Sequence, residues 1–195
     1  MDLKSRIAEA AERVLLTNGL AKTTTKEIAK AAGCSEGSLY NHFKSKEDLF
    51  LHVLRNQLKN LMAALTSLQS LAGTSPVRDN LKRVALAALG DFNASMSLIC
   101  SIFSDPNILY RHREGFTERN EGPHRANEAV EAYLLKEKQL GRIGDRVDAR
   151  AAADLLLGSC FQHAFQLNFL GREESLEEQA QFADRVLDLL SPGLE

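Results

Sequence analysis

Residues 24–48 carry the most informative pattern in the chain and read TTKEIAKAAGCSEGSLYNHFKSKED. The pattern opens with a capping box, because the Thr24 hydroxyl can accept from a free helix amide while the Glu27 carboxylate reaches back. Gly33 suits the end of the same helix, since glycine readily adopts the left-handed conformation found there. The spacing predicts a short helix between Thr24 and Gly33.

A second short helix is expected directly after this glycine. Ser35 can cap it, and the spacing predicts a helix over 36–42 that directs Leu39 and Phe43 toward a core. Two short helices joined by a glycine turn form a helix-turn-helix. The same arrangement also serves as a plain helical corner in all-α proteins, so the motif alone demands no particular partner.

The rest of the chain also has the pattern of helices, and no segment alternates apolar and polar residues over a sustained run. From Ser45 to Gly73 one long helix is expected, with Phe50, Leu54, Leu58, Leu61, Leu65 and Leu68 along one face. Other helices are expected to begin near residues 4, 76, 106, 123, 149 and 176, at Ser, Asp, Gly or Pro signals. The predicted fold is therefore all-α with about nine helices.

Two domains are expected in this all-α chain. Residues 1–47 form a three-helix head that contains the helix-turn-helix, and residues 48–195 form a larger helical domain. The long helix from Ser45 joins the two parts. The N-terminal part of the chain is the richer in basic residues, with ten Lys and Arg against seven Asp and Glu in residues 1–60, although the net charge of the chain is −2. A local basic face of this kind is sufficient for a nucleic-acid contact.

Composition points to a soluble protein, with 44% hydrophobic and 26% charged residues in a chain of 195. No uninterrupted apolar run approaches the roughly 18 residues that a membrane span needs. Residues 1–13 are charged and amphipathic and have no signal-peptide core. We therefore expect a cytoplasmic protein with no membrane partner.

Catalytic and metal-binding signatures are missing from the sequence. No GxSxG, P-loop, GxGxxG or HExxH motif occurs, and the five histidines are dispersed. Cys34, Cys100 and Cys160 lie far apart without CxxC spacing, so we expect buried small hydrophobes, with a redox- or electrophile-sensing thiol at Cys100 or Cys160 as the alternative. We expect no enzyme, no cofactor and no metal site.

The second short helix offers small hydrogen-bonding side chains around its circumference, at Glu36, Gly37, Ser38, Tyr40, Asn41 and His42. A helix of that width fits the major groove of DNA. The capping hydroxyl of Thr24, with Lys44 and Lys46, could hold phosphates on either side. Glu36 would be repelled by phosphate, so it either accepts from a cytosine amino group or turns away.

Residues 23–35, TTTKEIAKAAGCS, and 37–49, GSLYNHFKSKEDL, together resemble the N-terminal signature of the TetR/AcrR family of repressors. The resemblance covers about residues 5–50. It implies an all-α homodimer that places two heads on palindromic double-stranded operator DNA and carries an effector pocket in its C-terminal part. Cys34 stands where Val or Ile is usual, and Glu36 stands where Lys, Arg or Pro is common.

The resemblance also implies which residues contact DNA. Tyr40, His42 and Lys46 would bind phosphates, and Ser38 and Asn41 would read bases. The full implied set is Thr25, Ser35, Gly37, Ser38, Tyr40, Asn41, His42 and Lys46.

A twofold pairing of heads would give the affinity that one small head lacks and would fix the spacing of half-sites. The last two helices are the best candidates for this contact, because the helix over 149–170 is apolar around much of its circumference and needs cover on several sides. Burial inside a single protomer is the alternative. The expected interface residues are Leu155, Gly158, Gln162, Gln166, Phe169, Ala183, Leu187 and Leu190.

An unidentified small-molecule effector is expected to bind where bulky apolar groups mix with a few polar ones, as in small-molecule sites generally. The same composition also describes an ordinary core with partly exposed histidines. The candidate residues are Phe92, Met96, Cys100, Phe103, His112, Phe116, Tyr133 and His163.

The expected function is a sequence-specific transcriptional regulator, a repressor released from its operator by the effector. Three alternatives stay open at this point: an enzyme, a protein-binding module whose helix-turn-helix no longer contacts DNA, and an activator instead of a repressor.

Overall fold

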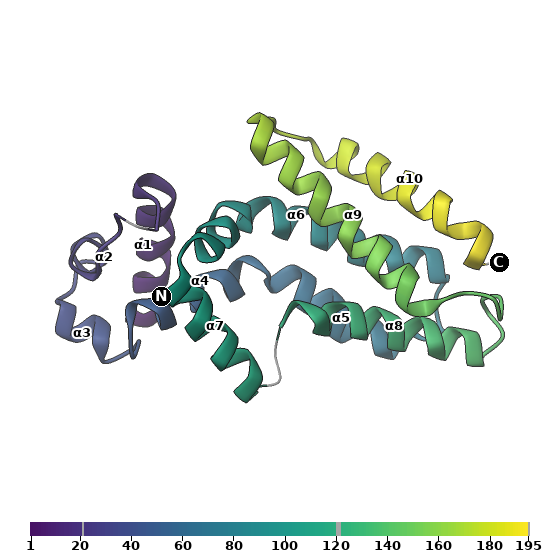
Figure 1. Ribbon diagram of the computed structural model, residues 1–195, viewed down its shortest axis with the longest axis horizontal. Helices are drawn as coiled ribbons and strands as arrows, with labels where there is room; N and C mark the ends of the chain where they lie inside the picture. The colour runs from purple at the N-terminus through teal and green to yellow at the C-terminus, as the bar shows by residue number, and fades with distance from the viewer. Residues whose placement is uncertain (21, 120–121, 195) are drawn as a thin grey trace. The chain divides into compact units, whose positions relative to one another are not determined.

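The computed structural model describes residues 1–20, 22–119 and 122–194, with side chains described except at 111, 112, 115–119 and 191–194. The regular structure of these ranges is entirely helical, which confirms the all-α prediction (Figure 1). The described part of the chain contains ten helices: α1 (Leu3–Asn18), α2 (Thr25–Ala32), α3 (Glu36–Tyr40), α4 (Lys46–Gln57), α5 (Lys59–Leu71), α6 (Val77–Ser104), α7 (Pro106–Arg119), α8 (Pro123–Gln139), α9 (Ala149–Leu170) and α10 (Leu176–Leu194).

Capping side chains explain where the later helices begin. At α9, Asp148 Oδ1 accepts from the amide of Ala151 at 2.9 Å. At α10, the Ser175 hydroxyl accepts from the amide of Glu178 at 3.3 Å, and Glu178 Oε2 accepts from the amide of Ser175 at 2.8 Å. These bonds satisfy amides that have no partner inside the helix, so the sequence signals located both starts correctly.

One expectation about the helices is wrong. The single helix predicted from Ser45 to Gly73 is divided at Leu58, whose φ of −97° and ψ of 12° interrupt it and whose side chain provides no cap. Asp91 of α6 replaces the cap: its carboxylate accepts from the amide of Leu61 at 2.8 Å and from Asn60 Nδ2 at 2.8 Å. A buried carboxylate from another helix thus stabilises the start of α5, and nine expected helices become ten.

The chain folds into two compact units, each built from two stretches of sequence. The first unit comprises Met1–Gln57 and Ser95–Glu121, and the second comprises Leu58–Ala94 and Gly122–Glu195. α6 therefore contributes to both units. The functional division at residue 47 stays a prediction, because compactness alone does not test which part binds DNA and which binds a ligand.

In the first unit, α1 packs against α2 and α4 and thereby holds the helix-turn-helix. Ile7 of α1, Ile28 of α2, Leu39 of α3 and Phe50 of α4 are completely buried there. Five residues are too few for a helix to be stable by itself in water. α3 therefore depends on the burial of Leu39, which contributes on the order of 2 kcal/mol.

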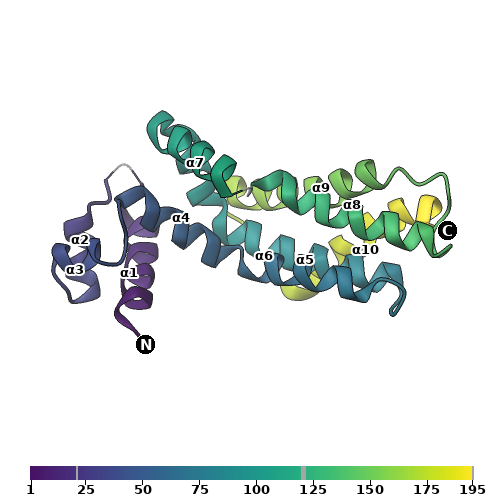
Figure 2. The same ribbon diagram turned by 90° about the horizontal axis from the view of Figure 1, so that it is seen from below.

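In the second unit, α8 lies against α5 and α9, and α10 lies against α9 (Figure 2). Polar groups are also buried in this unit. The Tyr133 hydroxyl accepts from Asn80 Nδ2 at 2.9 Å, and the completely buried carboxylate of Glu137 accepts from the amide of Gly73 at 3.1 Å and pairs with Arg142 at 3.3 Å. Burial raises the pKa of the Tyr133 phenol to about 12.

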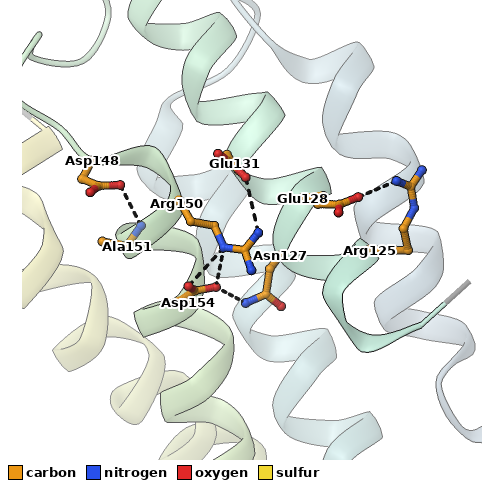
Figure 3. Close-up of polar contacts among 8 residues, drawn as sticks. All are labelled: Arg125, Asn127, Glu128, Glu131, Asp148, Arg150, Ala151 and Asp154. Carbon is orange, nitrogen blue, oxygen red and sulfur yellow. Dashed lines mark hydrogen bonds and ion pairs between the residues drawn. The ribbon is translucent and has the colours of Figure 1, made fainter. Parts of the chain in front are cut away.

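Exposed polar contacts join the N-terminal turn of α9 to α8 (Figure 3). Arg150 Nε donates to both carboxylate oxygens of Asp154, at 3.0 and 3.1 Å, and Nη1 lies 3.6 Å from Glu131. Asn127 of α8 also donates to Asp154. Hydrogen bonds from Asn127 and Arg150 hold the pKa of Asp154 below its usual value. Exposed pairs of this kind add little stability, so the contact orients the two helices more than it holds them together.

α6 is long and apolar enough to span a membrane by length and composition, with a mean hydropathy of 1.4 over its best window. Polar residues along α6 interrupt its apolar runs, so the helix does not appear as one continuous apolar segment in the sequence. Leu81, Ala85 and Leu89 of α6 nevertheless belong to the core of the second unit, and Asn80 and Asp91 are buried with hydrogen-bond partners. We therefore interpret α6 as a core helix.

Candidate nucleic-acid interface

The helix-turn-helix is held by the bonds that the sequence predicts. The Thr24 hydroxyl accepts from the amide of Glu27 at 3.2 Å, and Glu27 Oε2 accepts from the amide of Thr24 at 3.0 Å. Gly33 ends α2 with φ of 66° and ψ of 41°, a left-handed conformation that other residues adopt only with strain. The next amide, that of Cys34, bonds to the carbonyl of Ala29 at 2.9 Å and closes the turn.

One anchor of this turn comes from α1 and could not be located from local sequence signals. Arg6 Nη2 donates to the carbonyl of Ala32 at 2.6 Å. The carbonyls at the end of α2 carry partial negative charge, so a guanidinium is a favourable partner. α1 therefore fixes the end of α2, and with it the entry into α3.

α3 is shorter than expected, since it ends at Tyr40 and not at His42. Ser35 caps it by accepting from the amide of Ser38 at 3.1 Å, and the two hydroxyls lie 2.9 Å apart. The amide of His42 turns back to the carbonyl of Leu39 at 3.0 Å. The last residues of the motif thus form a turn, and His42 lies outside the helix.

The outer surface of α3 is polar and accessible. Leu39 is completely buried and Ser38 is half-buried, whereas Glu36, Gly37, Asn41 and His42 are exposed and 49% of Tyr40 is exposed. The structure therefore brings the predicted base readers Ser38 and Asn41, and the predicted phosphate ligands Tyr40 and His42, onto α3 or the turn that follows it. Their contacts with DNA stay predictions, since no nucleic acid is present.

Thr25, Glu36 and Tyr40 form a hydrogen-bonded chain between α2 and α3. Thr25 Oγ1 donates to Glu36 Oε1 at 2.7 Å, and the Tyr40 hydroxyl donates to Thr25 Oγ1 at 3.4 Å. Both Thr25 and Glu36 are the first residues of their helices. Thr25 is 11 residues from Glu36 and 15 from Tyr40, so the spacing of residues within one helix could not predict these hydrogen bonds.

The two predicted phosphate-binding lysines differ in their surroundings. Lys44 is exposed, and its backbone amide bonds to Asp48 at 3.1 Å. Lys46 is half-buried: Nζ donates to the carbonyl of Leu20 at 3.4 Å and lies 5.2 Å from the centre of the Phe50 ring. An ammonium carries three protons, so Lys46 retains donors for a phosphate.

The predicted effector residues are divided between the two compact units. In the second unit, Phe92 packs edge-on against Phe161 at 5.4 Å, Tyr133 is buried in the core, and His163 bonds to Glu174 at 2.9 Å. In the first unit, Met96 is buried, whereas Cys100 and Phe103 are exposed. The side chains of His112 and Phe116 lie outside the described residues.

Two hollows lie in the described part of the first unit, and the residues that line them include no predicted effector residue. The larger, of about 490 Å³, is open and lies between the end of α1 and the residues around the start of α7. The smaller, of about 10 Å³, has room for about one water molecule. It is lined by Gln57, whose Oε1 is buried without a hydrogen-bond partner. The effector site therefore stays a prediction.

The cysteine expectation holds at one position and fails at another. Cys160 is completely buried, and burial raises the pKa of its thiol to about 12, which keeps it protonated and unreactive. Cys100 is exposed, so its expected burial is wrong.

The expected dimer residues divide into two groups. Leu155, Gly158, Gln162, Gln166 and Phe169 are exposed and share one face of α9, with 61% of Leu155 and 78% of Phe169 exposed. Ala183 and Leu187 of α10 are completely buried in the core of their own protomer, and Leu190 packs against that core.

The assignment of Ala183 and Leu187 to a dimer contact is therefore wrong. The apolar stripe of α10 packs on the core of its own protomer, where Ala183 and Leu187 have no exposed surface and Phe182, Val186 and Leu190 are partly buried. Among the described side chains of α10, the large apolar residues that are exposed are Leu176 and Leu189.

The fold and the motif define an all-helical protein with an N-terminal helix-turn-helix, and comparisons with known proteins agree. Residues 7–53 match the model of "Bacterial regulatory proteins, tetR family". The regulator QacR of Staphylococcus aureus is 48% identical over 54 residues, which are 28% of this chain and 29% of QacR. An HTH-type transcriptional repressor of Mycobacterium tuberculosis is 27% identical over 190 residues, 96% of this chain and 90% of that protein.

The structural comparison covers nearly the whole chain. A TetR-family regulator from Mesorhizobium loti superposes with a TM-score of 0.75 at 22% identity, covering 97% of this chain and 96% of the other. The chain spans between 29% and 53% of the length of three curated relatives, QacR among them. The match to the family model is thus confined to residues 7–53, whereas the fold is like that of the Mesorhizobium loti regulator over nearly the whole chain.

Proposed function

We propose that this protein is a dimeric transcriptional repressor that lays α3 in the major groove of a palindromic operator and leaves it when a small molecule binds. The observation that carries the proposal is the exposed polar surface of α3, which includes a glycine that neither backbone conformation nor packing within the chain requires. The match of residues 7–53 to a family of bacterial regulators supports the same interpretation. We place the protein in the cytoplasm, where its DNA target lies.

Gly37 is the unusual residue on this surface. It lies inside a helix and has no positive φ, and a Cβ added there would meet only the Ser35 hydroxyl at 3.8 Å, an ordinary contact. Glycine lowers the stability of a helix relative to alanine. A residue that weakens the helix without being needed by its packing suits the close approach of an external backbone, such as that of DNA.

The side chains around Gly37 have complementary chemistry. Tyr40, His42 and the exposed Lys44 supply donors to phosphate oxygens, with Lys46 and the caps Thr24 and Ser35 at the edges of the motif. Thr25 lies beside them, but its hydroxyl proton is held by Glu36. Ser38 and Asn41 can both donate to and accept from base edges. We assign phosphate binding to the first group and base recognition to the second.

A second copy of the chain is the proposed partner of the exposed face of α9. Exposed Leu155 and Phe169 flank Gly158, Gln162 and Gln166 on that face, and a glycine allows close approach of two helices. Pairing two heads would place them about 34–36 Å apart along the duplex, or somewhat more, as a palindromic site requires.

Release by an effector requires two states of the dimer with different head spacings. The effector shifts the equilibrium only if it binds the non-operator spacing more tightly than the other. Screening metabolites for release of bound DNA tests this part. If no metabolite pool released the protein from its operator, the proposed release by an effector would be wrong.

Titration of protein into fluorescent duplexes at several salt concentrations tests the assigned roles. We expect Tyr40→Phe to weaken binding to all sequences, and Asn41→Ala to change the preference at one operator position. Equal affinity of Tyr40→Phe and wild type would remove the phosphate assignment. An unchanged base preference in Asn41→Ala would remove its role as a reader.

A further inference from the structure

In the hydrogen-bonded chain of Thr25, Glu36 and Tyr40, the Thr25 hydroxyl has no proton left to donate to a further acceptor. A threonine hydroxyl has one proton, and Thr25 gives it to Glu36 Oε1 at 2.7 Å. Tyr40 donates to the same Thr25 oxygen from 3.4 Å. A phosphate oxygen only accepts, so Thr25 can bind one only after its bond to the carboxylate is broken.

We propose that Glu36 is a negative determinant of DNA binding, which holds the Thr25 hydroxyl and repels the phosphate that Thr25 and Tyr40 would otherwise contact. This inference rests on the proposed function. Glu36 thereby lowers affinity for every duplex, whatever its sequence. Non-specific sites vastly outnumber operators, so weaker phosphate binding reduces the fraction of protein held on non-specific DNA. The choice of the operator over other DNA then depends more on the base contacts.

Charge and hydrogen bonding make separable contributions to this effect. Glu36→Gln keeps the shape of the side chain and an acceptor for Thr25 but removes the charge. A carboxylate and a phosphate that are close neighbours in water repel with an energy equivalent to about five-fold in affinity. We expect Glu36→Gln to tighten binding by about that factor at low salt, and the gain to shrink as salt screens the repulsion.

A role for Glu36 in base recognition gives the opposite sign. If the carboxylate accepted from a cytosine amino group, Glu36→Gln would weaken binding to the operator and leave random DNA unaffected. The sign of the change therefore separates the two roles.

A double-mutant cycle tests whether Glu36 acts through Thr25. In wild type the Thr25 hydroxyl is held by a charged acceptor, and in Glu36→Gln the acceptor is neutral and holds it more weakly. Thr25→Val should therefore reduce affinity more in the Glu36→Gln background than in the wild-type background. Equal reductions in the two backgrounds would mean that Glu36 acts without Thr25.

The experiment measures binding of the full chain to a fluorescent duplex of random sequence by anisotropy, at low and high salt. Glu9→Gln is the matched control, because it removes one negative charge from an exposed position on α1. The inference requires tighter binding by Glu36→Gln than by Glu9→Gln, with the difference lost at high salt. Binding no tighter than that of the control overturns it, and a wild type that binds no duplex, random or selected, overturns the regulator function as well.

Discussion

At the scale of single residues, a substitution of Gly37 should change folding stability and DNA affinity in opposite directions. Because a Cβ at this position would meet no close neighbour, Gly37→Ala should raise the free energy of unfolding by about 0.5 kcal/mol. The same methyl group would lie between α3 and an approaching DNA backbone and should weaken binding to all duplexes. Urea unfolding and anisotropy measured on the same preparation would show the two opposite changes.

Gly90 of α6 offers a control for this substitution, since a Cβ there also meets nothing within 4 Å. Gly90→Ala should stabilise the protein and leave DNA affinity unchanged. If Gly37→Ala also left affinity unchanged, the glycine would have no part in DNA binding.

Lys44 tests the electrostatic part of the interface because its exposed side chain leaves folding largely independent of it. Lys44→Gln should weaken binding uniformly across sequences and reduce the salt slope by about one unit. The exposed Lys59 on α5 provides a control of equal charge change. A full salt slope in Lys44→Gln would mean that this lysine contacts no phosphate.

Residues at the site were predictable where the signal is local. The capping box of Thr24 and Glu27, the left-handed Gly33 and the buried Leu39 all follow from spacing within a few residues. The bond between Thr25 and Glu36 depends on how α2 and α3 cross, which spacing does not specify. The same holds for the bond from Arg6 to Ala32, which joins residues 26 apart.

At the scale of helices, the break at Leu58 depends on Asp91, which accepts from the amide of Leu61 and from Asn60. Asp91→Ala would leave that buried amide without its acceptor, and we expect the free energy of unfolding to fall by about 2 kcal/mol. Urea denaturation measures the change. Asp148→Ala, which removes an exposed cap from α9, should lower the free energy of unfolding by about 1 kcal/mol and is the reference for comparison.

A smaller loss for Asp91→Ala than for Asp148→Ala would contradict the assignment of Asp91 as the cap of α5. The break could not be predicted from the sequence because the helical spacing of apolar residues continues across it. The residues with this spacing are Phe50, Leu54, Leu58, Leu61, Leu65 and Leu68. Periodicity reports which face is apolar, and here the same face continues through two helices. The residue that ends the continuity lies about 30 positions later in the chain.

At the scale of the whole molecule, buried titratable groups make folding sensitive to alkali. Burial raises the pKa of Cys160 and of Tyr133 to about 12, above the ordinary values of 9.0 and 10.0 that apply on unfolding. The unfolded chain therefore releases these protons first as pH rises. The contribution of these two groups to stability should be constant below about pH 9 and decrease from there toward pH 12.

Urea unfolding across this pH range checks the effect, and Cys160→Ala should reduce the slope between pH 9 and 12. A free energy of unfolding that stays level up to pH 12 in wild type would mean that neither group is protected from ionisation by burial.

The proposed dimer is also a property of the whole molecule. Phe169 is 78% exposed, so Phe169→Glu should cost the protomer little and should convert a dimer into a monomer by placing a charge in the contact. Light scattering measures this directly. Leu176→Glu, at an exposed apolar position on α10, is the comparison. A wild type that scatters as a monomer at micromolar concentration would remove the two-headed arrangement.

The sequence predicted that α9 and α10 would be apolar, but not which side of each would be covered. Ala183 and Leu187 satisfy the pattern of an interface and the pattern of a core equally well, and the packing of α10 on its own protomer decides between them. Effector residues were less predictable still, because a cavity depends on where packing fails to fill space.

Selection of bound fragments from random duplex DNA by the purified chain tests the central claim most directly. If α3 reads the major groove from a twofold dimer, the enriched fragments should share an inverted repeat with half-site centres about one helical turn apart or somewhat more. Retention should weaken steeply with salt. A selected pool without any shared sequence, retained no better than its starting mixture, would contradict the claim.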